Sequence, residues 1–250
     1  MTGALLIAGK EAGELLLSLR GLAWLLATSA VLSGFGLLLV GSSELSLLDN
    51  AQVVYDMLGT VTALGCLIAV VAGSDGIAGE RERGTLVPLL LAPLRREAIL
   101  FGKLGGQLVA WLAIFILALP YVWAVGSTGQ NLGSSILALA VLGTPLVLGF
   151  GFFALGLSAR VALARSSLLP SLILLLLSAS PLLLGPSLRQ SAVGRIFDAI
   201  NPFSGALNAY DAMIIDSEPL GAQLSRLALP VLWMLLAAGF AWTGVRRLAP

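Results

Sequence analysis

Histidine is absent from the 250 residues, and cysteine occurs once, at Cys66. Histidine is the side chain that most often serves as an acid–base catalyst near neutral pH and as a zinc ligand. A single cysteine excludes a disulfide within the chain and leaves no cysteine cluster that could hold a metal. We therefore predict that this chain holds no metal or cofactor and is not itself an enzyme.

Charge is also scarce. Charged side chains make up 11% of the sequence, whereas hydrophobic residues make up 58%. A soluble domain has about 25% charged and 45–50% apolar residues, so this chain has too few charges to cover a surface in water. The lipid bilayer is the expected solvent. A net charge of +1 gives no basis for expecting nucleic acid as a partner.

The stretches without charge predict the membrane spans, because a helix needs about 20 mostly apolar residues to cross the hydrocarbon. The uncharged run 104–159 would form one helix of roughly 80 Å, so it must turn back, most naturally at the polar stretch 126–131. The expected fold is an all-α integral membrane protein with one transmembrane domain over residues 1–250. Its six spans are about residues 21–41, 53–74, 104–125, 134–158, 166–186 and 227–245.

The basic residues orient these spans, because cytoplasmic loops carry an excess of lysine and arginine. With the N-terminus inside, eleven basic residues lie on the inner side: Lys10, Arg20, Arg81, Arg83, Arg95, Arg96, Lys103, Arg160, Arg165, Arg246 and Arg247. The outer side holds three, Arg189, Arg195 and Arg226. Both termini are therefore predicted to be cytoplasmic.

Residues 1–20 alternate leucine and alanine with a few charges at helical spacing, which indicates an amphipathic helix along the cytoplasmic interface. The alternative is a simple extension of the first span. The outer loop, residues 187–226, contains two short helical patterns, 193–200 and 206–215, separated by Asn201-Pro202. These helices are expected on or in the outer leaflet, either as a lid over an exit path or as packing.

The inner loop, residues 75–103, is the most charged part of the chain. Thr85 can cap a short helix over Leu86 to Leu91, with Pro88 tolerated in its first turn and Pro93 ending it. A second helical stretch then runs into the third span. An ordinary connection would need no leucine-rich run between charged clusters, and an exposed apolar patch of this kind is typical of a binding surface for a partner.

No predicted span has an ionisable group at its centre, which argues against a carrier driven by a coupling ion. No phosphate-binding G-x-x-x-x-G-K-[ST] motif is present, so energy would have to come from a partner. Gly65, Ala69 and Gly73 repeat at four-residue spacing in the second span. Such spacing allows close helix packing, either with another subunit or within this one.

The inner loop resembles the signature of type-2 ABC exporter permeases. The resemblance rests on Glu80, Gly84-Thr85-Leu86, the leucine-rich turn Leu89-Leu90-Leu91-Ala92-Pro93, Arg95-Arg96, and Gly102-Lys103 at the entrance to the third span. The six spans, the amphipathic N-terminus and Asn201-Pro202 in the last outer loop agree with the same family. The specific resemblance covers about 30 residues of the inner loop.

The resemblance implies that the inner loop is a coupling helix that docks on a separate ATP-binding subunit, with residues 1–20 as the connecting helix beside it. Two such ATPase subunits, which bind the ATP and Mg²⁺, would work with two permease chains, identical or homologous, in a bacterial or archaeal plasma membrane. An extracytoplasmic companion is left open. By position the coupling residues are Glu80, Arg81, Glu82, Arg83, Gly84, Thr85, Leu86, Pro93, Arg95 and Arg96.

The uncharged spans favour a hydrophobic or amphipathic cargo over an ion. Related permeases also serve gliding motility and maturation of the copper centre of nitrous-oxide reductase, which is an alternative output for this chain. Alternatives from other classes are an ATP-independent channel or carrier, and a membrane scaffold.

Overall fold

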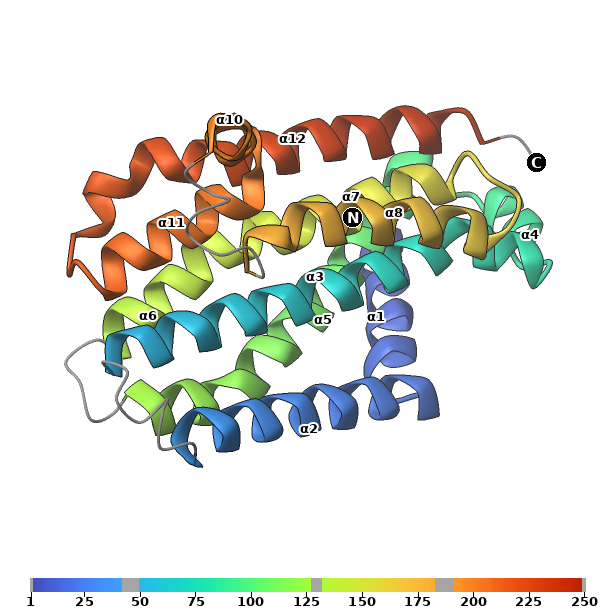
Figure 1. The fold of residues 1–250 in the computed structure, drawn as a ribbon. Helices are drawn as coiled ribbons and strands as arrows, with labels where there is room; N and C mark the ends of the chain where they lie inside the picture. Colours follow the sequence, from blue (N-terminus) through green and yellow to red (C-terminus); the bar gives the residue numbers. More distant parts are fainter. Residues whose placement is uncertain (1, 42–49, 127–131, 183–190, 249–250) are drawn as a thin grey trace.

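The computed structural model describes residues 2–41, 50–126, 132–182 and 191–248, and within these ranges it contains helices and turns but no strand. Six helical segments are long and apolar enough to cross a membrane, which confirms the predicted count and the all-α fold. Figure 1 shows them side by side in one bundle. The segments are α2 (Leu19–Gly41), α3 (Asn50–Glu82), α5 (Arg96–Gly126), α6 with η2 and α7 (Leu132–Ala138, Leu139–Gly143, Thr144–Ser158), α8 (Ala164–Ala179) with η3 (Ser180–Leu182), and η4 (Leu220–Gln223) with α12 (Leu224–Arg246).

Two helices extend well beyond the predicted spans. α3 continues to Glu82, although the charges place the end of the span near residue 74. α5 begins at Arg96, ahead of the span near residue 104, which confirms the predicted helical stretch that follows Pro93 and runs into the third span. At 1.5 Å per residue, α3 is about 50 Å long, against a hydrocarbon core of about 30 Å. Charge indicates where a helix leaves the lipid, whereas glutamate, arginine and lysine continue a helix readily in water. The predicted turn at 126–131 and the start of the outer loop lie largely outside the described residues.

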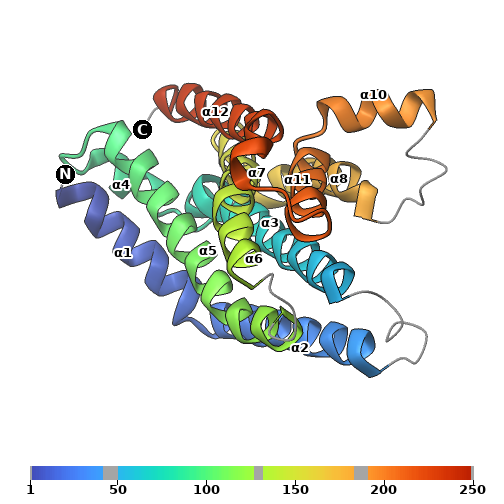
Figure 2. The ribbon, with the colours of Figure 1, turned by 90° about the vertical axis from the view of Figure 1, so that its left-hand side faces the viewer.

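The N-terminal segment forms a helix of its own, α1 (Thr2–Leu16), which ends at a turn before α2 begins. α1 runs across the direction of the spans and packs along α5 (Figures 1 and 2). Two glycines of α5 allow this approach: a Cβ atom at Gly102 would lie 2.5 Å from Ile7 Cβ, and one at Gly106 would lie 2.4 Å from Glu11 Cβ. The alternative of α1 as a simple extension of the first span is therefore wrong.

α3 and α7 form the centre of the bundle, and the three small residues of α3 face its interior. A Cβ atom at Gly65 would lie 2.4 Å from the Trp111 ring of α5, and one at Gly73 would lie 2.4 Å from the Gly151 carbonyl oxygen of α7. Ala69, between them, is 5% exposed. Packing within the subunit accounts for all three residues, which favours the second of the two interpretations of this stripe.

The described segment that starts at residue 191 begins with two short helices, α10 (Ala192–Ile200) and α11 (Pro202–Ile214). Asn201 separates them, because its side-chain oxygen accepts a hydrogen bond from the Phe203 amide at 3.0 Å and its side-chain nitrogen donates to the Ser178 carbonyl at 2.8 Å. α11 is mostly buried against α3, α6 and α12, so it belongs to the packed core. α10 projects from the bundle in Figure 2.

Candidate coupling site

The inner loop consists of the end of α3, a tight turn, the short helix α4 (Leu86–Leu91) and the start of α5. The predicted bounds of α4 are confirmed. Gly84 has φ +70°, a conformation that glycine adopts without steric cost. The Gly84 amide donates to the Arg81 carbonyl at 3.1 Å and the Thr85 amide to the Glu80 carbonyl at 2.9 Å, the hydrogen-bond pair that ends many helices at such a glycine. Gly84 therefore sets the direction in which the chain leaves α3.

Thr85 precedes α4 as predicted, but its side chain makes no capping hydrogen bond to that helix. The hydroxyl donates instead to the Glu80 carboxylate and lies 3.2 Å from the Glu80 carbonyl oxygen. Thr85 thus ties the turn back to α3.

α4 has one buried and one exposed face. Leu86 is buried in a small apolar cluster at this end of the bundle, where it joins Ile77, Leu100 and residues of α7 and α12. Val87 and Leu91 point outward and are 50% and 70% exposed. Figure 1 shows α4 at the end of the bundle that also carries the C-terminus, which we call the α4 end. α4 is therefore anchored on one side and offers apolar side chains on the other.

Glu80 is not on this exposed surface. It is 3% exposed, and its carboxylate lies 2.9 Å from Lys10 Nζ of α1 and 3.2 Å from Lys103 Nζ of α5. Lys103 is also buried and lies 2.5 Å from the Glu11 carboxylate of α1. Glu80 was expected among the coupling residues, and its burial means that it would take part in coupling through these lysines rather than through exposed side-chain atoms. A buried carboxylate needs cations around it, and here the cations come from α1 and α5. Glu80 therefore joins α1, α3, α5 and the turn.

The sequence used Lys10 and Lys103 to orient the spans and Lys103 also in the family resemblance, but it gave neither lysine a partner and gave Glu11 no role. A usable signal was present, since Lys10, Glu11 and Glu14 place opposite charges on a short amphipathic helix. The pKa of Lys10 reflects this pairing. Partial burial lowers it, but the hydrogen bond and negative charge of Glu80 outweigh burial and raise the pKa above the ordinary lysine value. Lys10 therefore stays charged throughout the neutral range.

The next three charged residues each contact another part of this chain, although Glu82 and Arg83 are also exposed. Arg81 donates to the Val161 carbonyl in the loop between α7 and α8. The Glu82 carboxylate accepts the Ala164 amide at 2.6 Å, at the N-terminus of α8, where a negative charge is favourable. Arg83 pairs with Asp75 at 3.0 Å. The turn is thus fixed to α8 as well as to α1 and α5.

The exposed remainder of the predicted site is a smaller surface than the sequence indicated. Besides Val87 and Leu91 it comprises Gly84, Thr85, Pro93, Arg95 and Arg96, together with the exposed parts of Glu82 and Arg83. Arg96 donates to the Arg246 carbonyl at 2.8 Å, whereas the side chain of Arg95 has no hydrogen-bond or ion-pair partner among the described residues. This surface is apolar at its centre and basic on the side where α5 begins.

A hydroxyl from α7 contacts the backbone of α3 one turn before Glu80. Ser158 Oγ donates to the Ser74 carbonyl at 2.7 Å and accepts the Ala78 amide, also at 2.7 Å. An undisturbed α-helix would pair those two groups with each other. The sequence gave no sign of Ser158, because the contact joins residues about 80 positions apart. A side chain inserted in this way is a recognised cause of helix bending.

The charged side chains of this region connect helices to one another. Among the described residues, no group of three or more cysteine or acidic side chains is placed to hold a metal. The carboxylates are engaged by lysine, arginine or backbone groups. What the arrangement can do is transmit a displacement of α4 to four helices of the bundle.

Comparison with known proteins identifies a family over most of this chain and two curated relatives over about half of it. A family model described as "ABC-2 family transporter protein" matches residues 5–246. The probable ABC transporter permease protein NosY of Stutzerimonas stutzeri is 34% identical over 142 residues, covering 53% of this chain and 45% of that protein. The NosY protein of Pseudomonas aeruginosa is 38% identical over 136 residues, covering 46% and 48%. The matched region is about half the length of these curated relatives.

Proposed function

Since this chain belongs to the ABC-2 family of transporter proteins and is a multi-pass membrane permease of that family, we propose that it is the membrane-spanning half of an ATP-driven exporter. In this proposal two permease chains, identical or homologous, work with two ATP-binding subunits. ATP and Mg²⁺ are bound and ATP is hydrolysed in those subunits. The complex lies in a bacterial or archaeal plasma membrane, with both termini of this chain in the cytoplasm, as its basic residues predict.

The observation that carries the proposal is the construction of the α4 end. α4 presents Val87 and Leu91 outward, while its neighbouring turn is joined to α1 and α5 through Glu80 and to α8 through Glu82. A subunit that docks on α4 would therefore move four helices as one body. Packed interfaces respond to such displacements by discrete rigid shifts rather than by continuous deformation.

The experiment is co-purification of the native complex from membranes with the exposed face of α4 altered. Leu91→Asp places a charge in the centre of the proposed docking surface and should abolish recovery of the ATP-binding subunit. Ile200→Asp is the matched control, since Ile200 in α10 is 69% exposed against 70% for Leu91 and lies on the opposite side of the predicted topology. Equal recovery of the ATPase with both variants would refute docking on α4.

Two further measurements separate the alternatives from other classes. In proteoliposomes, export that proceeds without ATP would identify a channel or carrier. Stable folding with no associated ATPase in native membranes would identify a scaffold. The cargo we propose is hydrophobic or amphipathic, because no ionisable side chain lies at the centre of a predicted span.

A second candidate output is assistance in maturing the copper centre of nitrous-oxide reductase or a related mechanical task. The observation that favours it is the similarity to two permeases named NosY. The chain contains no histidine and one buried cysteine, so a metal would be carried by a companion protein. Deleting the chain from its host and measuring the copper content of the purified reductase tests this candidate, since an unchanged content refutes it.

A further inference from the structure

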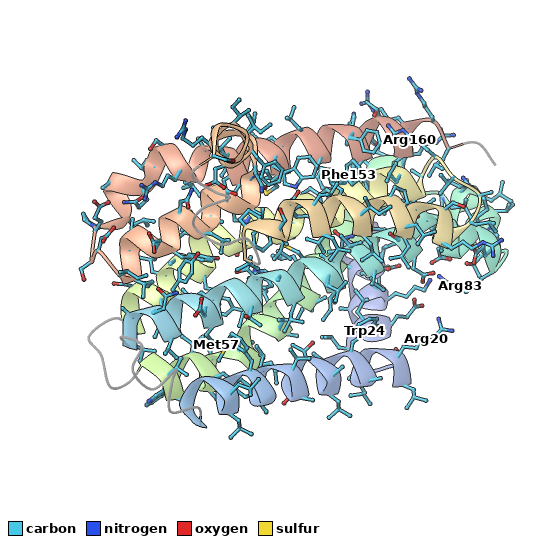
Figure 3. All side chains as sticks on the ribbon, in the orientation of Figure 1. Arg20, Trp24, Met57, Arg83, Phe153 and Arg160 are labelled. Atoms are coloured by element: carbon cyan, nitrogen blue, oxygen red, sulfur yellow. The ribbon has the colours of Figure 1, made fainter. Side chains whose placement is uncertain are left out.

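A cavity of about 510 Å³ lies at the α4 end, between α1, the start of α2, α3 and the start of α8. Its volume falls within the usual range for small-molecule sites. In Figure 3, the labelled side chains of Arg20, Trp24 and Arg83 lie around the space between α2 and α3. Two ion pairs described above, Arg83 with Asp75 and Lys103 with Glu11, form part of its lining. The cavity therefore adjoins the coupling site, on the side of α1, α2 and α8.

The lining changes from charged to apolar along the bundle. On α2, Arg20 is one turn closer to the α4 end than Trp24, and on α3, Asp75 is two turns closer than Ile68. On α8, Arg165 precedes Leu168 in the same sense. At 1.5 Å per residue, the charged groups lie about 5–10 Å nearer the α4 end than the apolar ones. A ligand that matched both levels would have a polar head and an apolar tail.

The charges of the cavity do not balance within the chain. Its three carboxylates each have a cation: Glu11 lies 2.5 Å from Lys103, Asp75 lies 3.0 Å from Arg83, and Glu14 lies 3.5 Å from Lys10. The described residues provide no hydrogen-bond or ion-pair partner for the two remaining cations of the lining, which are exposed.

These two cations are Arg20 and Arg165. A guanidinium group binds phosphate oxygens through two parallel hydrogen bonds. The cavity thus has two positions for an anion above an apolar wall.

We propose that this cavity binds one anionic phospholipid from the leaflet that the basic residues predict to be cytoplasmic. Its phosphate lies between Arg20 and Arg165, and one acyl chain lies against Trp24, Ile68 and Leu168. Free phosphate would leave the apolar wall without a partner, and a cationic amphiphile would face carboxylates that are already paired. Basic pockets between membrane helices on the cytoplasmic side are known to suit anionic lipid headgroups.

This site is independent of the proposed export function, because lipid binding requires neither ATP nor a second chain. It lies next to the hydrogen bonds that Ser158 makes to the backbone of α3. Ser74 lines the cavity, and its carbonyl accepts the Ser158 hydroxyl. An occupied cavity would therefore lie directly beside the contact between α3 and α7.

The test uses the purified full chain in phosphatidylcholine nanodiscs with increasing amounts of phosphatidylglycerol that carries brominated acyl chains. Bromine quenches nearby tryptophan fluorescence, and Trp24 lies in the cavity. We expect a saturable quenching component that is lost in Trp24→Phe. In Arg20→Gln/Arg165→Gln, half-saturation should shift to higher phosphatidylglycerol by about fivefold for each arginine removed. Brominated phosphatidylcholine should show no saturable component.

The matched control is Arg95→Gln/Arg247→Gln, which removes the same charge from two exposed arginines at the same end but outside the cavity. If half-saturation shifts equally in both double variants, the lipid is attracted to basic residues in general and not to this cavity. That result would overturn the proposal. So would saturation by brominated phosphatidylcholine, or displacement of the lipid by millimolar inorganic phosphate. The single variant Arg165→Gln gives the same readout if the double variant does not fold.

Discussion

Replacing Glu80 by glutamine removes the charge that joins α1, α3 and α5 while keeping the volume of the side chain. Glu80 and Lys103 are 3% and 4% exposed, and their closest atoms lie 3.2 Å apart. Removing one member of a buried ion pair costs about 3–5 kcal/mol when the remaining charge has no other partner. Lys103 keeps Glu11 at 2.5 Å, and Lys10 is half exposed and can be hydrated. Glutamine also still accepts a hydrogen bond from Thr85.

We therefore expect a loss of about 2–3 kcal/mol, close to the value of one or two hydrogen bonds between charged groups. The midpoint temperature of thermal unfolding, measured on the purified chain in detergent, should fall by on the order of 5 °C or more. In the complex with its ATP-binding subunit, the variant should hydrolyse ATP with reduced export, because α4 would move without carrying α1 and α5.

Glu14→Gln is the control for this experiment. Glu14 is 54% exposed and lies 3.5 Å from the same Lys10, so its loss should cost no more than about 0.5 kcal/mol. A second check is a cycle with Lys103→Gln, in which the double variant should lose less than the sum of the two single losses. If Glu80→Gln unfolds at the same temperature as Glu14→Gln and the losses are additive, the role assigned to Glu80 is refuted.

Three other substitutions test separate contacts by the same unfolding and export measurements. Gly84→Ala should destabilise by about 1 kcal/mol, since φ is +70° there; no loss would mean that the turn tolerates another backbone conformation. Ser158→Ala should lower the free energy of unfolding by about 1–3 kcal/mol, because the Ser74 carbonyl and the Ala78 amide lose the hydroxyl that they share. Amide hydrogen exchange near Ala78 should accelerate. Unchanged exchange would contradict the hydrogen bonds from Ser158 to α3. Gly106→Val should detach α1 from α5, because a Cβ atom there would lie 2.4 Å from Glu11 Cβ, so a protease site placed before α1 should become more accessible.

The sequence was sufficient for the features that depend on local chemistry. Six spans followed from the uncharged stretches, because lipid penalises charge wherever it occurs along a helix. The bounds of α4 followed from Thr85, Pro88 and Pro93, because these residues limit the backbone near themselves. The orientation of the termini stays a prediction from the basic residues. The family was also recognisable from the inner loop alone.

Only the tertiary structure decided which of the inner-loop charges face outward. Glu80, Arg81 and Glu82 lie next to each other in the sequence, but their partners are Lys10, Val161 and Ala164, which come from other parts of the chain. The packing of α1 along α5 depends in the same way on contacts between distant residues. Local composition determines where a helix forms and whether it enters lipid, whereas burial of a charge depends on which helices pack around it, and that is settled when the bundle assembles.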